Sequence, residues 1–171
     1  MIDFQRPGED ADLGMFRQTV TRFMQDELEP ADEKAREAGH VGHAIWRRAG
    51  ELGLLCTDIP DEYSGGGGDF RHEAAIGEEL YRRSLTGMNM AVHSIVAHYV
   101  LNHGTEEQKQ RWLPRMARGE LVGAIAMTEP GAGSDLQDIR LRASKAEGHY
   151  VLQGSKTFIS NGYLAGLVLV V

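Results

Sequence analysis

Apolar residues recur at helical spacing along the first part of the chain. The first stripe predicts an amphipathic helix, which Pro30 interrupts. Its apolar members are Leu13, Phe16, Val20, Phe23 and Leu28. A second stripe ends at Gly53, because glycine adopts the left-handed conformation that closes a helix at little cost. It consists of Ile45, Ala49 and Leu52.

Turn-forming residues then separate these helices from the next ones. The stretch CTDIPDEYSGGGGD, residues 56–69, predicts a loop. Its glycine run lacks the preceding strand and the following Lys-Ser/Thr of a phosphate-binding loop, so we expect a flexible turn there. Asp69 is a suitable cap for a further helix. One face of that helix carries Phe70, Ala74, Gly77, Leu80 and Tyr81, and we expect Glu78 and Glu79 to lie on its solvated surface.

The next segment, GMNMAVHSIVAHYVLNHG at residues 87–104, is apolar nearly all round. Such a helix is typical of the centre of a bundle. Thr105 followed three places later by Gln108 predicts a capping box at the start of another helix. The buried side of that helix is supplied by Trp112, Leu113 and Met116.

After Gly119 the hydrophobic period changes from helix to strand. LVGAIAMT, residues 121–128, predicts a buried strand, and the following residues predict strands that reverse at Glu147-Gly148 and again near Gly154-Ser155. We therefore predict an α+β chain, with an all-α helical domain over residues 1–119 followed by the start of an antiparallel β domain over 120–171. The apolar final stretch LAGLVLVV would leave an open edge, from which we expect a longer parent protein.

Composition narrows the class of partner. A hydrophobic content of 42% is enough for a buried core, whereas a net charge of −7 argues against nucleic acid and anionic membranes as partners. The single cysteine excludes disulfides within the chain and clustered thiolate metal sites. The first ten residues show no leader pattern, and no stretch reaches the roughly 18 apolar residues of a membrane span. We expect a soluble, unexported protein with no membrane span.

The segment AMTEPGAGSD, residues 126–135, is the first candidate for chemistry. Its glycines at positions 131 and 133 allow main-chain N–H groups to approach a ligand closely, and Ser134 adds a hydroxyl donor, a combination that suits phosphate or pyrophosphate. The spacing is not that of a Rossmann fingerprint, and strands rather than a helix follow. The alternative is a tight connection between strands in which Asp135 forms an Asx turn.

A second candidate is KTFISNG, residues 156–162. In a strand, Phe158 and Ser160 would share one face, so that one could stack on a flat ligand while the other donates to its edge. Simple core packing by Phe158 is the alternative. The histidines His93, His98 and His103 are spaced five apart, which rotates each by about 140° from the last, so they do not converge on a metal.

Several of these stretches together resemble the acyl-CoA dehydrogenase family. AIAMTEPGAGSD, residues 124–135, closely resembles the family signature, and GSKTFISNG, residues 154–162, resembles its second flavin-contact segment. ELGLLCTDIPDEYSGGGGD and NHGTEEQKQRWLPRMARGE are also similar to family segments. Long-chain members are the most similar by eye. The resemblance implies a further, C-terminal helical domain that this chain lacks.

The resemblance also implies FAD as cofactor and assigns roles to residues. Thr128 would lie near the edge of the flavin ring, and the pyrophosphate near Gly133 and Ser134. Ser134 would also border the acyl-CoA substrate, and Ser160 would reach flavin N5. The full implied cofactor set is Ile125, Ala126, Met127, Thr128, Glu129, Pro130, Gly131, Ala132, Gly133, Ser134, Phe158, Ile159 and Ser160.

The implied reaction removes an α-proton from a fatty acyl-CoA while a β-hydride passes to flavin, giving the 2-enoyl-CoA of fatty acid β-oxidation. Hydrogen bonds from Thr128 and Ser160 would stabilise the negative charge of reduced flavin. The family's base is a glutamate of the absent domain, so we assign no catalytic residue here and treat Glu129 as part of the cofactor loop. Met88, Ala91, Val92 and Ile95 could wall the acyl tail or form plain bundle core.

Two positions depart from the family pattern. Asp138 stands where a small residue is common, and Phe158 where tryptophan is common. The resemblance further implies an electron-transferring flavoprotein as redox partner, a homotetramer and, for a chain without a leader, a cytoplasmic location. The alternatives are an acyl-CoA oxidase or flavin monooxygenase of the same fold, or a fragment that is inactive as isolated.

Overall fold

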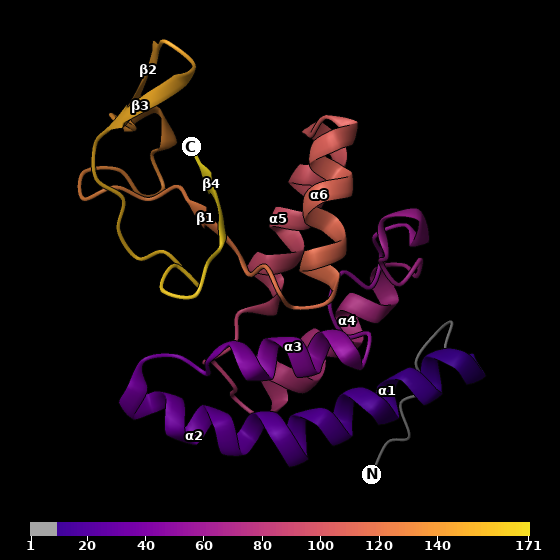
Figure 1. Ribbon diagram of the computed structural model, residues 1–171. Coiled ribbons are helices and arrows are strands. Elements are labelled where there is room, and N and C mark those ends of the chain that lie inside the picture. The colour runs from indigo at the N-terminus through magenta and orange to yellow at the C-terminus, as the bar shows by residue number, and fades with distance from the viewer. Residues whose placement is uncertain (1–9) are drawn as a thin grey trace.

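The computed structural model describes residues 10–171, so the first nine residues, on which the expectation of no leader depends, lie outside the described part. Helices come first in the chain and strands follow (Figure 1). The helices are α1 (Ala11–Phe23), α2 (Glu29–Ala38), α3 (His43–Glu51), α4 (Phe70–Arg82), α5 (Met90–His103) and α6 (Glu106–Ala117). The strands are β1 (Gly123–Ala126), β2 (Arg142–Ala146), β3 (His149–Gln153) and β4 (Leu167–Val170). This order confirms the α+β class.

α1 and α2 form one long rod along one side of the molecule (Figure 1). A π-helical segment, Met24–Leu28, joins them, and Pro30 lies in the first turn of α2. The prediction that Pro30 interrupts the helix was therefore wrong. Proline lacks a main-chain N–H, but the first turn of a helix does not need one for its internal hydrogen bonds. The wider π turn changes the hydrogen-bonding register just before Pro30.

The helical core forms where α1, α3 and α4 meet. Trp46 of α3 is completely buried among apolar side chains of the first stripe, of which Val20, Phe23 and Leu28 are also buried. Gly119 packs so closely on α3 that an added Cβ would lie 2.0 Å from the carbonyl oxygen of Trp46. The end of the helical part is thus fixed directly against the backbone of α3.

The glycine run 65–68 is a packed loop, and the prediction of a flexible turn was wrong. All four glycine N–H groups donate to carbonyl oxygens of residues 56–60, at distances of 2.9 to 3.2 Å. A Cβ on Gly65 would lie 2.2 Å from the carbonyl oxygen of Ile59. Gly65, Gly66 and Gly68 are needed because two backbone segments pack against each other without room for a side chain, and Gly67 has a φ of 61°.

α4 begins at the predicted cap. Asp69 Oδ1 accepts the N–H of Arg71 at 2.9 Å, and His72 Nδ1 accepts the N–H of Asp69 at 3.2 Å. Glu78 is exposed as expected, but Glu79 is only 8% exposed, and Arg83 Nε donates to its carboxylate at 3.2 Å. The expectation that Glu79 lies on the solvated surface was wrong, because two following arginines compensate its burial.

The capping box at α6 is confirmed. Gln108 N–H donates to Thr105 Oγ1 at 3.3 Å, while Thr105 N–H donates to Gln108 Oε1 at 2.9 Å. α5 packs against both α6 and β1, yet Ile95 and Tyr99 on its other face are 46% and 43% exposed. α5 is therefore central on one side only. Among residues 10–171, no helix has the length and apolar character that crossing a membrane requires.

The strands form two separate pairs. β2 and β3 make the predicted antiparallel hairpin, with the turn at Gly148 in the left-handed conformation. β1 and β4 pair in parallel, from Gly123 opposite Leu167 to Ala126 opposite Val170, which corrects the expectation of antiparallel pairing throughout. Residues 154–166 between β3 and β4 form a loop rather than the further strand expected after Gly154-Ser155. The crossover that allows β4 to run in the same direction as β1 comprises residues 127–166, with the β2–β3 hairpin and this loop in it.

Candidate functional site

The segment after β1 folds back on itself in a tight turn. Glu129 and Ala132 exchange two main-chain hydrogen bonds, at 2.8 and 3.2 Å, across Pro130 and Gly131. Asp135 then accepts the N–H of Gln137 at 3.1 Å, which is the Asx turn that the sequence suggested as an alternative. The turn thus satisfies its own backbone and leaves the region around Gly133 and Ser134 at the surface.

The two glycines of this turn are not required by the fold. An added Cβ on Gly131 or Gly133 would meet no atom within 4 Å, and neither residue has a positive φ. Elsewhere in the chain, glycines such as Gly65 and Gly119 are needed for close packing. The bare backbone at positions 131 and 133 faces open space, a geometry that admits a ligand close to the main chain.

The carboxylate of Glu129 points inward and joins three segments. Its Oε2 accepts the N–H of Arg140 at 2.8 Å, its Oε1 accepts the N–H of Leu141 at 2.9 Å, and Lys156 Nζ lies 2.9 Å from Oε1. The main-chain N–H of Arg140 and the ammonium of Lys156 lower the pKa of Glu129 to about 2. A carboxylate held ionised by this many donors is a poor proton acceptor, which agrees with treating Glu129 as part of the loop and not as a base.

The second candidate segment lies beside the first. Thr157 N–H donates to the carbonyl oxygen of Thr128 at 2.9 Å, and Lys156 Nζ donates to that of Met127 at 2.9 Å. The structure therefore brings together two stretches that are about thirty residues apart in the sequence. Met127 and Thr128 of the expected cofactor set are thus in contact with Lys156 and Thr157, which directly precede its other members, Phe158 to Ser160.

The expected geometry of Phe158 and Ser160 was wrong. These residues lie in a loop, Phe158 has a φ of 57°, and its side chain is 90% exposed. They cannot share a face as alternate residues of a strand would. Core packing by Phe158 is also excluded by its exposure. The exposed ring of Phe158 remains available to stack on a flat ligand.

A cavity of about 280 Å³ lies beside this loop. Its walls include Ser160 and Tyr163 of the loop and His40 after α2, whose ring stacks on Tyr163 with centroids 4.8 Å apart. Asn161 Nδ2 donates to the carbonyl oxygens of Asn89 and Gly123, at 2.9 and 3.2 Å. Through Asn161 the loop is thus bound both to the residue that caps α5 and to the first residue of β1.

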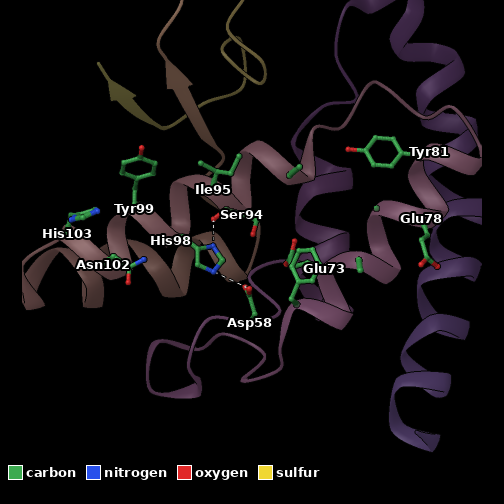
Figure 2. Close-up of a pocket in the computed structure, with 14 residues that line it drawn as sticks. Asp58, Glu73, Glu78, Tyr81, Ser94, Ile95, His98, Tyr99, Asn102 and His103 are labelled. Atoms are coloured by element: carbon green, nitrogen blue, oxygen red, sulfur yellow. Dashed lines mark hydrogen bonds and ion pairs between the residues drawn. The ribbon is translucent and has the colours of Figure 1, made fainter. Parts of the chain in front are cut away.

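A larger cavity, of about 680 Å³, lies between α4 and α5 (Figure 2). Four members of the predicted α4 face line it, whereas Leu80 faces the core. Of the expected acyl-tail wall, Ala91 and Ile95 line this cavity and Met88 is fully buried in the core. The other lining residues are Asp58, Glu73, Glu78, Ser94, His98, Tyr99, Asn102 and His103.

The floor of this cavity is polar, which the sequence did not predict. His98 Nε2 lies 3.1 Å from Asp58 Oδ2, and Thr57 Oγ1 donates to Glu73 Oε1 at 2.6 Å. Burial raises the pKa of Glu73, and the nearby carboxylate of Asp58 adds to the effect. The residues belong to the loop before α4, to α4 and to α5, so no local spacing pattern connects them.

The three spaced histidines have separate environments, as expected from their spacing. His93 is buried and bonded at both ring nitrogens, His98 pairs with Asp58, and His103 is exposed at the end of α5. Across residues 10–171, no three His, Cys, Asp or Glu side chains are grouped closely enough to hold a metal ion.

The chain is an α+β protein in which a helical part leads through the buried strand β1 into an exposed glycine turn. Comparison with known proteins identifies its family. Residues 10–120 match the model of the acyl-CoA dehydrogenase N-terminal domain, and residues 124–171 match that of the acyl-CoA dehydrogenase middle domain. The chain belongs to the acyl-CoA dehydrogenase family, which confirms the resemblance noted in the sequence.

Relatives cover nearly all of this chain. The mitochondrial long-chain specific acyl-CoA dehydrogenase of Rattus norvegicus is 44% identical over 158 residues, which are 92% of this chain and 37% of the relative. The mitochondrial isovaleryl-CoA dehydrogenase of Bos taurus is 35% identical over 173 residues, covering 99% of this chain and 41% of the relative. This chain therefore spans about two fifths of the length of these relatives.

Solved structures of the family have the same fold. The crystal structure of an acyl-CoA dehydrogenase from Geobacillus kaustophilus matches 97% of this chain and 44% of its own, with a TM-score of 0.89 and 39% identity. A Bacillus anthracis acyl-CoA dehydrogenase complexed with FAD matches 98% of this chain and 29% of its own, with a TM-score of 0.89 and 35% identity.

Proposed function

We propose that this chain is part of an FAD-dependent acyl-CoA dehydrogenase that converts fatty acyl-CoA thioesters to 2-enoyl-CoA. The main-chain hydrogen bond from Thr157 to Thr128 carries the proposal, because it joins the two segments that resemble the family's flavin contacts. The matching structure from Bacillus anthracis, described as a complex with FAD, supports the choice of cofactor.

The residues present fit this cofactor. Gly131 and Gly133 leave open space beside bare backbone, which suits a pyrophosphate, and Ser134 is exposed next to them. Phe158 is an exposed aromatic that can cover one face of a flat ring. In the proposal, residues 125–134 run along FAD and residues 158–160 flank its ring system.

FAD, when bound, supplies the hydride acceptor for the Cβ–H of the substrate. The contribution of this chain would be to bind and orient it: the hydroxyls of Thr128 and Ser160 would donate hydrogen bonds at the ring edge, where negative charge develops during the reaction. The proton from Cα goes to a base outside residues 1–171. Glu129 does not take that role, since its carboxylate is committed to Lys156 and two main-chain N–H groups.

The substrate side of the proposal is a long-chain acyl-CoA. The similarity to a long-chain specific dehydrogenase supports it, while the similarity to isovaleryl-CoA dehydrogenase leaves a short branched acyl group as the second candidate. Ser134 would border the acyl-CoA substrate. In the cavity between α4 and α5, Ala91 and Ile95 supply apolar wall for an acyl tail.

The proposal extends to partners and setting. We propose transfer of electrons to an electron-transferring flavoprotein, a homotetrameric full-length protein, and a cytoplasmic role in fatty acid β-oxidation. A solved chain described as the electron transferring flavoprotein of Acidaminococcus fermentans matches 94% of this chain with a TM-score of 0.83 and 31% identity. That similarity supports a link between this fold and flavoprotein electron transfer.

An absorbance spectrum of the full-length protein tests the proposal. Purified protein should show an oxidised-flavin band that bleaches on anaerobic addition of palmitoyl-CoA. Addition of isovaleryl-CoA in a parallel sample distinguishes the two substrate candidates. Turnover with an artificial electron acceptor but not with oxygen would separate a dehydrogenase from an oxidase. A protein that is free of flavin and cannot be reconstituted with FAD would contradict the proposed function.

A further inference from the structure

We propose that Lys156 is a positioning residue, which with Glu129 holds the loop of residues 157–161 against the turn after β1 and so sets the separation between Thr128 and Ser160. The consequence for the cofactor rests on the proposed function. The anchoring itself is a property of this chain.

Lys156 makes its contacts in a buried setting. Its Nζ donates to the carbonyl oxygen of Met127 at 2.9 Å and lies 2.9 Å from Glu129 Oε1, and the two side chains of the ion pair are only 8% and 7% exposed. The lysine thus reaches both the residue before Thr128 and the residue after it. A buried ion pair is retained only with good geometry, and removal of one partner leaves an uncompensated charge.

Glu129 extends the anchor to a third segment. Its two oxygens also accept the N–H groups of Arg140 and Leu141, which lead into β2. The carboxylate is therefore held by the main-chain N–H groups of Arg140 and Leu141 at the start of the hairpin, and also by the ammonium group of Lys156. Because Glu129 is itself held, the position of the lysine and of the chain that follows it is determined by the turn after β1.

The loop that begins at Lys156 contains the residues proposed to face the flavin. Thr157 N–H donates to Thr128 O directly after the anchor, Phe158 follows in the left-handed conformation, and Asn161 binds the far end of the loop to α5 and β1. A non-glycine residue at positive φ is costly and is maintained by its surroundings. We infer that loss of the Lys156 anchor relaxes Phe158 and moves the hydroxyl of Ser160 away from that of Thr128.

The test uses the full-length protein with two variants and a matched control. Lys156→Met keeps the length of the side chain and removes the ammonium, whereas Glu129→Gln keeps its volume and removes the charge. Arg140→Gln is the control, because the Arg140 side chain is 80% exposed and pairs with Asp138 rather than with Glu129. The readouts are amide hydrogen exchange of residues 155–161 in cofactor-free protein, the dissociation constant for FAD, and the rate of flavin reduction by acyl-CoA.

We expect Lys156→Met to increase the amide exchange rates of residues 155–161 about tenfold. We also expect it to raise the dissociation constant for FAD about tenfold, which corresponds to about 1.4 kcal/mol of binding free energy. Arg140→Gln should stay within about twofold of wild type, and a double variant of Lys156 and Glu129 should resemble the worse single variant, because both act through one contact. Where Lys156→Met does not fold, Glu129→Gln decides with the same readouts.

The outcomes separate this inference from the proposed function. Wild-type exchange and FAD affinity in a folded Lys156→Met variant would overturn the positioning role while leaving the dehydrogenase proposal intact. Wild-type protein that binds no FAD, with exchange of 155–161 still accelerated in the variant, would overturn the proposed function and support the anchor.

Discussion

His93 Nδ1 accepts the main-chain N–H of Gly123 at 3.1 Å, which links the first turn of α5 to the first residue of β1. Since Nδ1 accepts, the proton is on Nε2, which donates to the carbonyl oxygen of Met116 at 3.2 Å. The neutral ring therefore joins α5, the end of α6 and the strand that leads to Thr128. Through this contact the helical part positions the start of the candidate site.

The first prediction concerns acid stability. Burial lowers the pKa of His93 to about 4, against 6.5 in an exposed histidine. Above pH 6.5 the residue is neutral in both states, whereas between about pH 6.5 and 4 only the unfolded chain binds the proton, so stability falls as the pH falls. The free energy of unfolding should decrease by about 2 kcal/mol between pH 7.5 and 5 from this residue alone.

Urea denaturation of His93→Asn and His93→Gln at the two pH values checks this. Both variants should lose that pH dependence, while His103→Asn, at an exposed position of the same helix, should retain it. The asparagine amide can still accept near the Nδ1 position, so His93→Asn should preserve slow amide exchange at Gly123 better than His93→Gln. Equal pH dependence in wild type and both His93 variants would refute the assignment.

The second prediction concerns the two hydroxyls. In the full-length protein, replacement of both Thr128 and Ser160 by alanine should slow flavin reduction by about tenfold or more, because each lost hydrogen bond to developing charge is worth about 1 kcal/mol or more. The fold should be retained, since Thr128 binds Thr157 through its main-chain oxygen. Stopped-flow absorbance measures the rate. Ser155→Ala, at an exposed position of the same loop, is the control, and unchanged rates in the double variant would rule out a role at the ring edge.

The third prediction contrasts two glycines. Gly65→Ala should destabilise the protein by about 2 kcal/mol or more, because its Cβ would collide with the Ile59 carbonyl group. Gly133→Ala should leave the melting temperature within about 1 °C, since its Cβ would meet no atom within 4 Å, yet it should weaken FAD binding by obstructing the approach to the backbone. Thermal melts and FAD titration test both. A Gly133→Ala protein with normal FAD affinity would remove the turn from the proposed binding site.

The fourth prediction concerns the floor of the larger cavity. Because burial and Asp58 raise the pKa of Glu73, its charged form destabilises the fold at neutral pH. Glu73→Gln keeps an acceptor for Thr57 and should increase the free energy of unfolding by about 0.5–1 kcal/mol at pH 7. The gain should diminish as the pH falls, because a raised pKa leads the folded wild type to take up a proton on Glu73 at a higher pH than the unfolded chain does. Chemical denaturation at pH 7 and 5 provides the measurement, and a destabilised variant at pH 7 would show that the charge of Glu73 is favourable.

Local patterns correctly identified the elements with strong local signals. The caps at Asp69 and Thr105, the end of α3 near Gly53 and the turn at Gly148 all depend on side chains within a few residues of each other. The run from residue 124 to 135 was also recognisable, because its residue types form a long and specific signature. Its proposed contact with FAD remains a prediction.

Errors occurred where hydrogen bonds and ion pairs that hydrophobic spacing does not encode decide the outcome. The glycine loop 65–68 is ordered by carbonyl groups of residues 56–60, and Glu79 is buried because arginines compensate it. The expected strand around Phe158 is a loop, because Lys156 and Asn161 bind its ends to β1 and α5. The alternation of Phe158 and Ser160 with their neighbours does not predict the hydrogen bonds of Lys156 and Asn161.

The sequence by itself determined the order of helices and strands, the family and the two candidate segments, because these depend on local spacing and residue type. Only the tertiary structure decided that β1 and β4 run in parallel, that Glu129 and Lys156 pair, and that His93 supports Gly123. These contacts join residues 27 to 44 positions apart. Burial and hydrogen bonding select such partners from many with the same local pattern, so the selection becomes visible only when the chain is folded.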